Sequence, residues 1–285
     1  PEVVPHGDRI DNLKWGLDVT NMYTYWMRKM TFIANSGGVP NEMEQLNAGY
    51  REERYAEDPN FTRFSSWNGG NPVGQFEYLS GTPELSKNFD DYDYTLENTM
   101  DAADQRHDVT TRVVISGTYT PNGFGSVATR NGGGISFYYF KGNAIRVEAM
   151  RDMVNDRGQI PQELRDAGLE QAIENVLAWN PNAFNSPTAS FSEGGINFYY
   201  QGVCYYTVLI RHFSNNMVPV LMGYGRYGVV RNNVYQLSIN KIIGPGQPVI
   251  NPPGTDPDDE DTSWISADVN IMRWYIRNQN VEELL

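Results

Sequence analysis

Carboxylates gather in two short stretches of this 285-residue chain, and alternating carboxylates can bind Ca²⁺ through their oxygens. One stretch reads NFDDYDY and the other reads DPDDED. Together they contain Asp90, Asp91, Asp93, Asp256, Asp258, Asp259, Glu260 and Asp261. Neither stretch has the central glycine and distal glutamate of an EF-hand loop. We therefore interpret both as solvated loop charge, with a calcium site as the alternative.

Other catalytic or metal-binding patterns are not found in the sequence. The histidines His6, His107 and His212 have no ligand-pair spacing, so no zinc site is predicted. The motifs of serine hydrolases, P-loops and dinucleotide-binding folds do not occur. The single cysteine, Cys204, lies in an aromatic strand pattern and is interpreted as a buried structural thiol. We predict no enzyme and no cofactor; a glycosidase, which needs two carboxylates across a cleft, is a distant alternative.

Aromatic runs raise the question of a sugar-binding platform. They read FEYL, SFYYF and NFYYQGVCYY. Consecutive residues of a strand face opposite sides of the sheet, so such a run does not present all its rings on one face. Packing in the core and on the sheet surface is the preferred interpretation.

The total charge argues against two kinds of partner. Lysine and arginine number 22, whereas aspartate and glutamate number 35, which gives a net charge of −13. A chain this acidic repels nucleic-acid phosphates and anionic membranes, so neither is an expected partner. The sequence also contains no run approaching the roughly 18 apolar residues of a membrane-spanning helix.

Alternation of apolar and polar residues predicts several strands joined by turns. Trp15, Leu17 and Val19 alternate with polar or small residues, as do Tyr235, Leu237 and Ile239. The strand in VTTRVVISGTYT ends at a turn formed by Pro121, Asn122 and Gly123. Two hairpins are predicted, with bends at Lys141-Gly142-Asn143 and at Gln201-Gly202.

One amphipathic helix interrupts this β pattern. Pro161 suits its first turn and Pro181 ends it. Leu169, Ile173, Val176 and Leu177 fall on one face at helical spacing, which predicts packing on a β domain. Strands with turns and one inserted helix favour a mostly β chain forming an antiparallel β-sandwich, with long loops between residues 35 and 95.

Several blocks of sequence together resemble a known family. They are WGLDVTN, YTLENTMDAADQ with TTRVVISGTY, GVCYYTVLIRHF, YGRYGVVRNNVYQLSINKIIGPGQP and ISADVNIMRWYIRNQNVEEL. Their order and wording resemble the C-terminal domain of fimbrillins, the major fimbrial subunits of type V pili in Bacteroidales. The resemblance is greatest to main subunits of the short, minor-type fimbriae of Porphyromonas, and it covers nearly the whole chain from about residue 10.

The resemblance implies a fold, a function and a location. Such subunits are exported as lipoproteins to the outer membrane of a Gram-negative bacterium, are cleaved by an arginine-specific protease, and have two transthyretin-like β-sandwich domains. They polymerise by strand exchange into cell-surface fimbriae that support adhesion and biofilm formation. The implied partners are other copies of the same subunit, accessory tip and anchor subunits, and receptors on host or bacterial surfaces. A surface-exposed glycan- or protein-binding module is the alternative.

We expect this chain to be the C-terminal portion of such a subunit, because the family's N-terminal domain and lipid-bearing cysteine are not recognisable in it. Residues 1–9 would be the interdomain connector. Residues 10–250 would form the β-sandwich domain, with the helical insertion near 160–180. Residues 251–285 would be an acidic, Pro-rich tether followed by the C-terminal strands.

The apolar pattern of the tail changes phase near its end. Ile265, Ala267, Val269 and Ile271 share one face of a strand, whereas Met272, Trp274 and Ile276 are apolar on the other set of positions. A shift of one residue exchanges the two faces, so the tail is either one strand with a bulge or two successive strands. With the resemblance, we expect donation of Met272–Leu285 to a neighbouring subunit. An ordinary last strand of the same domain is the alternative. The candidate polymerisation residues are Met272, Trp274, Ile276, Ile265, Val269 and Ile271.

Overall fold

The computed structural model describes residues 2–26, 58, 75–125, 134–212, 225–260 and 265–273, and most of their regular structure is β-strand. The strands are β1 (Glu2–Val4), β2 (Arg9–Asp18), β3 (Thr20–Asn21), β4 (Phe76–Glu77), β5 (Arg112–Thr120), β6 (Phe137–Phe140), β7 (Asn143–Arg146), β8 (Phe191–Glu193), β9 (Ile196–Tyr199), β10 (Val203–Leu209), β11 (Asn233–Ile243) and β12 (Ile265–Arg273). The α-helices are α2 (Val147–Asn155), α3 (Gln162–Asp166) and α4 (Leu169–Trp179). Short 3-10 helices are η1 (Ala102–Asp104), η2 (Arg157–Gln159), η3 (Tyr200–Gly202) and η4 (Asp258–Glu260).

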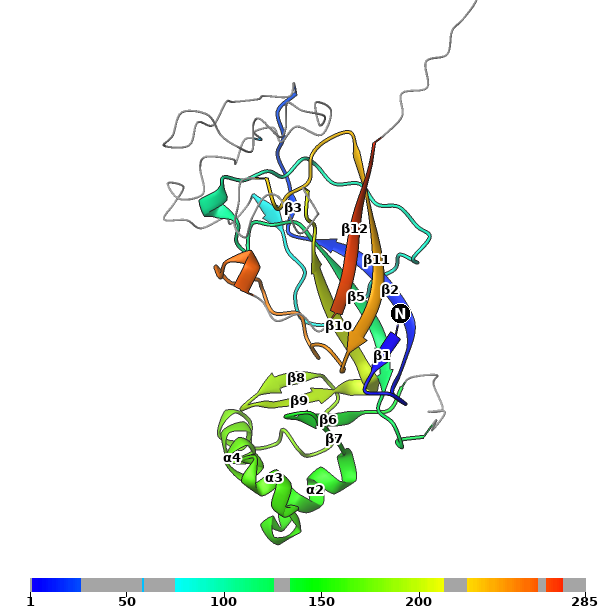
Figure 1. The fold of residues 1–285 in the computed structure, drawn as a ribbon. Coiled ribbons are helices and arrows are strands. Elements are labelled where there is room, and N and C mark those ends of the chain that lie inside the picture. Colours follow the sequence, from blue (N-terminus) through cyan, green and yellow to red (C-terminus); the bar gives the residue numbers. More distant parts are fainter. Residues whose placement is uncertain are drawn as a thin grey trace, which may run out of the picture.

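Two three-stranded sheets enclose the core of the upper part of the molecule in Figure 1. One sheet has the order β10-β5-β2 and is antiparallel; the other has the order β1-β11-β12, with β1 parallel to β11 and β12 antiparallel to it. Ile115 of β5, Tyr206 of β10 and Ile242 of β11 meet in one cluster, and none of them is more than 2% exposed. The mostly β prediction is therefore confirmed for the part of the chain that the structure describes.

Strand β11 shows why this sequence pattern forms a sheet with one face in the core. Tyr235, Leu237 and Ile239 pack against the cluster, whereas Gln236 and Ser238 are exposed. Successive residues of a strand point to opposite faces, so the alternation buries one row and leaves the other in water. The predicted alternation is confirmed.

A second sheet and three helices form the lower part of the molecule (Figure 1). The sheet has the order β7-β6-β9-β8. Phe137 of β6 belongs to the core of the upper sheets, whereas its neighbour Tyr138 belongs to the core shared with the helices. The rings of Phe137 and Tyr199 stack with centroids 4.7 Å apart. The aromatic run SFYYF therefore serves two cores, one on each face, which confirms the packing interpretation.

The predicted amphipathic helix forms, but in two pieces. Helices α3 and α4 are separated by Ala167 and Gly168; Gly168 has a φ of 91°, a conformation that glycine adopts without steric cost. Leu169, Ile173 and Val176 are buried in the lower core, and Leu177 is partly buried against it. Helix α4 contacts β8 and β9 of the lower sheet, so it packs on a β-sheet as the spacing predicts.

Helix α2 was not predicted from the sequence. The hairpin at Lys141-Gly142-Asn143 is confirmed, because β6 pairs with β7 across it. The second strand ends at Arg146, however, and the next residues form a helix. Met150 and Met153, three residues apart on the helix, are both buried in the lower core.

The hairpin predicted at Gln201-Gly202 is wrong. Strand β9 pairs with β6 and β8, and β10 pairs with β5, so the chain leaves one sheet and enters another at this point. Gln201 and Gly202 have φ values of 54° and 70°. A Cβ atom on Gly202 would lie 2.6 Å from the carbonyl oxygen of Tyr119. The two residues therefore form a tight corner between sheets, which local turn chemistry does not distinguish from a hairpin bend.

Candidate functional site: the C-terminal strand and its anchor

Strand β12 lies at the edge of its sheet and pairs along its whole length with β11. The pairs run from Ile242 opposite Ile265 to Asn233 opposite Arg273. The register shifts once, between Ile239 and Lys241, so the extra residue is Asn240 on β11. This bulge allows both Ile239 and Ile242, three residues apart, to contact the core.

The register places four of the six candidate polymerisation residues. Ile265, Val269, Ile271 and Met272 lie in β12, opposite Ile242, Leu237, Tyr235 and Val234, respectively. Trp274 and Ile276 lie outside the described residues. The structure thus brings four of the candidates together in one strand.

The change of phase at Ile271–Met272 does not interrupt β12. Pairing continues without a shift from Ile271 opposite Tyr235 to Arg273, and the bulge is on the partner strand. Residues that oppose each other in an antiparallel ladder share a face of the sheet. The register position of Met272 is therefore on the same face as Val234, opposite to the core-facing row of Tyr235. The expected break into a bulge or a second strand at this point is wrong.

The segment between β11 and β12 is held on the body of the protein. Gln247 exchanges backbone hydrogen bonds with Tyr205 of β10, and Ile250 exchanges them with Gly81. Ile250 is buried against the outer face of the β10-β5-β2 sheet. These two pairs of backbone hydrogen bonds fix the segment that follows β11 on the body of the protein.

Two carboxylates of DPDDED are buried, which corrects the interpretation of this stretch as solvated charge. The Thr110 hydroxyl donates a hydrogen bond to the Asp258 carboxylate at 2.5 Å, and Asp258 is only 3% exposed. Asp259 pairs with Arg226 at 2.8 Å and accepts a hydrogen bond from the Tyr227 hydroxyl at 2.7 Å. Asp256 is exposed, as expected; Asp261 and the side chain of Glu260 lie outside the described part of the chain.

Burial has an electrostatic consequence for Asp258. Desolvation raises its pKa to about 7, and the nearby Asp259 and Asp108 carboxylates act in the same direction. The hydrogen bond from Thr110 and the charge of Arg112 oppose this shift. Asp258 is therefore a titratable group near neutral pH in the segment that leads into β12.

The other acidic stretch, NFDDYDY, remains at the surface as predicted. Asp90, Asp91 and Asp93 are exposed. Asp91 accepts hydrogen bonds from the backbone and side-chain nitrogens of Asn88, at 2.6 and 2.9 Å, and these bonds lower its pKa. In the described residues, no group of three or more histidine, cysteine, aspartate or glutamate side chains is arranged to hold a metal ion.

Cys204 and His212 are buried and have structural partners. Cys204 is fully buried, and desolvation raises its pKa to about 12, which confirms the structural interpretation. His212 is also fully buried, and its Nδ1 lies 2.7 Å from the Tyr235 hydroxyl. The Cys204 thiol donates to the carbonyl of Gly117 on β5 at 3.4 Å, and Tyr235 lies on β11, so both residues contact strands of the upper sheets.

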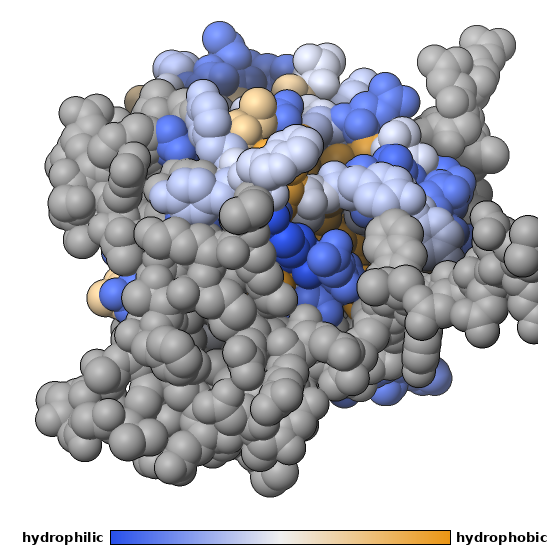
Figure 2. Space-filling view, turned by 90° about the horizontal axis from the view of Figure 1, so that it is seen from above, coloured by the Kyte–Doolittle hydropathy of each residue, from blue (hydrophilic) through white to orange (hydrophobic). Residues whose placement is uncertain are grey.

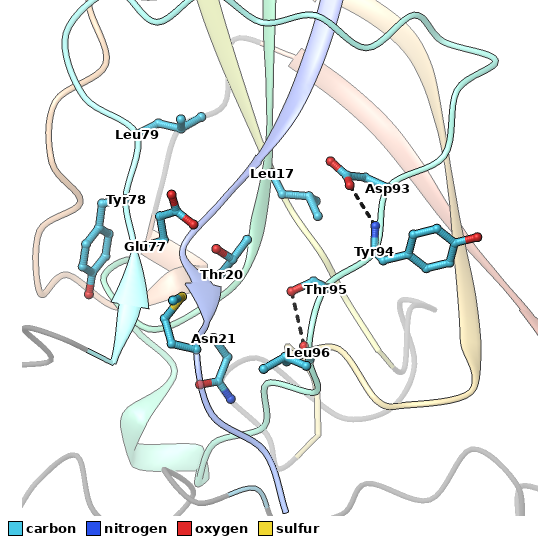
Figure 3. A pocket seen from close by; sticks show the side chains of 11 residues that line it. Leu17, Thr20, Asn21, Glu77, Tyr78, Leu79, Asp93, Tyr94, Thr95 and Leu96 are labelled. Carbon is cyan, nitrogen blue, oxygen red and sulfur yellow. Dashed lines mark hydrogen bonds between the residues drawn. The ribbon is translucent and has the colours of Figure 1, made fainter.

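A pocket of about 440 Å³ opens beside β3 and β4. Figure 3 shows β3 and β4 on one side, residues 93–96 on the other, and Leu17 of β2 between them. The amide nitrogen of Asn21 donates to the carbonyl of Glu97 at 2.6 Å, which joins the two sides. The volume of the pocket falls within the roughly 300–1,000 Å³ that is typical of small-ligand sites. The run FEYL, unlike the other aromatic runs, contributes to this pocket through Glu77, Tyr78 and Leu79.

The strands and their buried polar contacts define a mostly β protein whose last described strand lies at a sheet edge. Residues 197–280 match a family model described as major fimbrial subunit protein type IV, fimbrillin, C-terminal. The match contains β10, β11 and β12 and supports a fimbrillin-family protein. That family implies a structural fimbrial subunit, not an enzyme, that assembles with other subunits into a cell-surface appendage.

No curated protein matches the chain. The longest described helix, α4, has 11 residues, and no helix in the described ranges is long and apolar enough to cross a membrane.

Proposed function

We propose that the chain is a shaft subunit of a fimbria and that its tail, Met272–Leu285, pairs with a neighbouring copy beyond Arg273, where β12 ends. The observation that carries this proposal is the position of β12 at the edge of the β1-β11-β12 sheet. An edge strand has a row of backbone donors and acceptors with no partner in its own sheet, and an added strand can bind to them. The family match over residues 197–280 supports the same function.

The tail has a composition suited to such pairing. Its residues Met272, Trp274 and Ile276 alternate with Arg273, Tyr275 and Arg277. Alternation of this kind lets one face of a strand enter an apolar groove while the other stays in water. Each large apolar side chain buried in a neighbour would contribute about 1.5–3 kcal/mol.

The finer parts of this proposal follow the resemblance to the short-fimbria subunits of Porphyromonas. They are a transthyretin-like topology for the domain, export as a lipoprotein to the outer membrane, and strand exchange between subunits. Accessory tip and anchor subunits would complete the fimbria, which would support adhesion to surface receptors and biofilm formation.

Electron microscopy of the full-length subunit tests the proposed function. Filaments of uniform width are expected. A preparation that stays monomeric under conditions of assembly would contradict it.

A glycan- or protein-binding surface module is the second candidate, and exposed aromatic side chains favour it. Trp26 is 97% exposed, and Tyr92 and Tyr94 are each at least 77% exposed. Exposed aromatic groups are enriched at binding surfaces. Binding to a glycan array without filaments would favour this second function.

A further inference from the structure

The pocket beside β3 and β4 receives carboxylates from both sides. The side-chain carboxylate of Glu77, on β4, makes no hydrogen bond or ion pair with any residue that the structure describes. Asp93 accepts a hydrogen bond from the Tyr94 amide at 2.9 Å and lies 3.7 Å from the ammonium nitrogen of Lys87. Both contacts use Oδ1, so Oδ2 of Asp93 is available to a ligand.

Between the two carboxylates the pocket is apolar. Leu17, Leu79 and Leu96 line it, and Figure 3 shows their side chains in the space between β3–β4 and residues 93–96. Seen from above, the molecule shows hydrophobic surface between hydrophilic side chains on the face drawn in Figure 2. A ligand that matches this arrangement carries positive charge at its end and an aliphatic stem behind it.

Two other ligand classes fit less well. A sugar ring would need an aromatic face to stack on, but the ring of Tyr94 points away from the other side chains that line the pocket (Figure 3). The hydroxyl of Tyr78 donates to the carbonyl of Asp108 at 2.8 Å, which fixes that ring in the wall. An anionic ligand would be repelled by Glu77 and Asp93.

The walls of the pocket are fixed before any ligand binds. The Leu79 amide donates to Asp18 at 2.7 Å, and Asp18 in turn pairs with Arg112 at 2.7 Å. Asp18 and Arg112 are both buried, so the pair is shielded from water. Together with the bond between Asn21 and Glu97, these contacts reduce the ordering cost of binding.

We propose that this pocket is a docking site for a lysine or arginine side chain of a partner polypeptide. Glu77 and Asp93 attract the charged end of that side chain, and its stem lies on Leu17, Leu79 and Leu96. Arginine is among the residues enriched at the energetic centres of protein interfaces, where it fills a pocket on the partner. This role goes beyond the shaft function, since it concerns a different surface from β12.

Nuclear magnetic resonance of the ¹⁵N-labelled chain tests the proposal with the peptide acetyl-Gly-Arg-Gly-amide. The matched control peptide has citrulline, a neutral isostere, in place of arginine. We expect the arginine peptide to shift the amide signals of Leu17, Thr20 and Thr95, and the citrulline peptide to leave them in place. The double variant Glu77→Gln, Asp93→Asn should weaken binding roughly tenfold, whereas Glu84→Gln, an exposed carboxylate outside the pocket, should not change it.

Three results would overturn the proposal. They are equal binding of the two peptides, shifts confined to another surface, and binding that is unchanged in the double variant. Both substitutions are on exposed residues, and unchanged thermal unfolding confirms that the variant is folded.

A second titration replaces the peptide with an unlabelled copy of the chain and shows whether the partner is another subunit. Shifts at the same three amides support docking of a side chain from another subunit. If the arginine peptide binds but the unlabelled copy causes no such shifts, the partner is a different polypeptide.

Discussion

The hydroxyl of Thr110 donates a hydrogen bond to Asp258, whose position in the sequence is 148 residues later. The second carboxylate oxygen of Asp258 has no hydrogen-bond partner among the described residues, although it is buried. The Asp258 amide also donates to the carbonyl of Gln105, so backbone and side chain both hold this residue on the loop before β5. The approach to β12 is thus anchored at a residue whose charge is costly to bury.

This anchor makes stability depend on pH. The pKa of Asp258 is about 7 in the folded chain, above the roughly 3.9 of an unfolded aspartate, so the folded state holds its proton more tightly. Its contribution to stability is therefore fully present only below the unfolded pKa of about 3.9, is partly lost by pH 5, and is lost completely as pH rises through 7. Asp258→Asn should remove this dependence, so that the difference in unfolding free energy between variant and wild type changes by about 3 kcal/mol from pH 5 to pH 8.

Urea unfolding of both proteins at the two pH values measures that change. The exposed Asp256→Asn variant is the control and should follow the wild type. Equal slopes with pH for Asp258→Asn and wild type would show that Asp258 is ionised throughout.

The buried ion pair between Arg226 and Asp259, next to Asp258, should contribute more to the free energy of unfolding than an ion pair at the surface. Arg226 and Asp259 have side chains only 8% and 6% exposed, whereas those of Arg9 and Asp11 are 60% and 56% exposed. Arg226→Met leaves a buried carboxylate without its cation and should lower the unfolding free energy by about 3–5 kcal/mol. Arg9→Met should lower it by less than about 1 kcal/mol. Thermal unfolding compares the two variants, and similar losses would contradict this assignment.

The lower core depends on the buried face of α4. Ile173 is fully buried, so Ile173→Ala should cost about 2–5 kcal/mol of unfolding free energy through lost contacts and the cavity left behind. Gln171 lies on the exposed face of the same helix, and Gln171→Ala should have almost no effect. Guanidinium titrations of both variants measure these values; an unaffected Ile173→Ala would show that the helix does not stabilise the fold.

Cys204 should be unreactive while the chain is folded. Its thiol is fully buried, and a pKa of about 12 leaves almost no thiolate at pH 8. Iodoacetamide should therefore alkylate it only after denaturation, as intact mass measured in buffer and in guanidinium would show. Alkylation at equal rates in both solutions would mean that this strand opens readily.

Local patterns were sufficient to predict some elements of the fold. Tyr235, Leu237 and Ile239 alternate with polar residues, and Ile173 and Val176 have helical spacing, so each set could be assigned to its element from sequence alone. Both signals arise from neighbouring residues that share a face. Helix α2 has the weaker signal of Met150 and Met153 at helical spacing, which the preceding strand pattern obscured.

Contacts between distant parts of the chain could not be predicted in the same way. An aspartate in a run of acidic and proline residues is usually solvated, and only the fold places Thr110 and Arg226 beside Asp258 and Asp259. The pocket likewise combines Glu77 with Asp93 from separate segments, and its sequence signals were the run FEYL and the acidic stretch NFDDYDY. The corner at Gln201-Gly202 depends on the approach of Tyr119, which no local pattern contains.

The most direct test of the proposed assembly is deletion of residues 272–285, followed by electron microscopy of the subunits. A companion deletion of residues 274–285 leaves β12 complete, since that strand ends at Arg273. We predict that both shortened chains fold, with thermal unfolding close to that of the full chain, and that neither forms filaments. Filaments of normal length from either shortened chain would contradict donation of the tail to a neighbouring subunit.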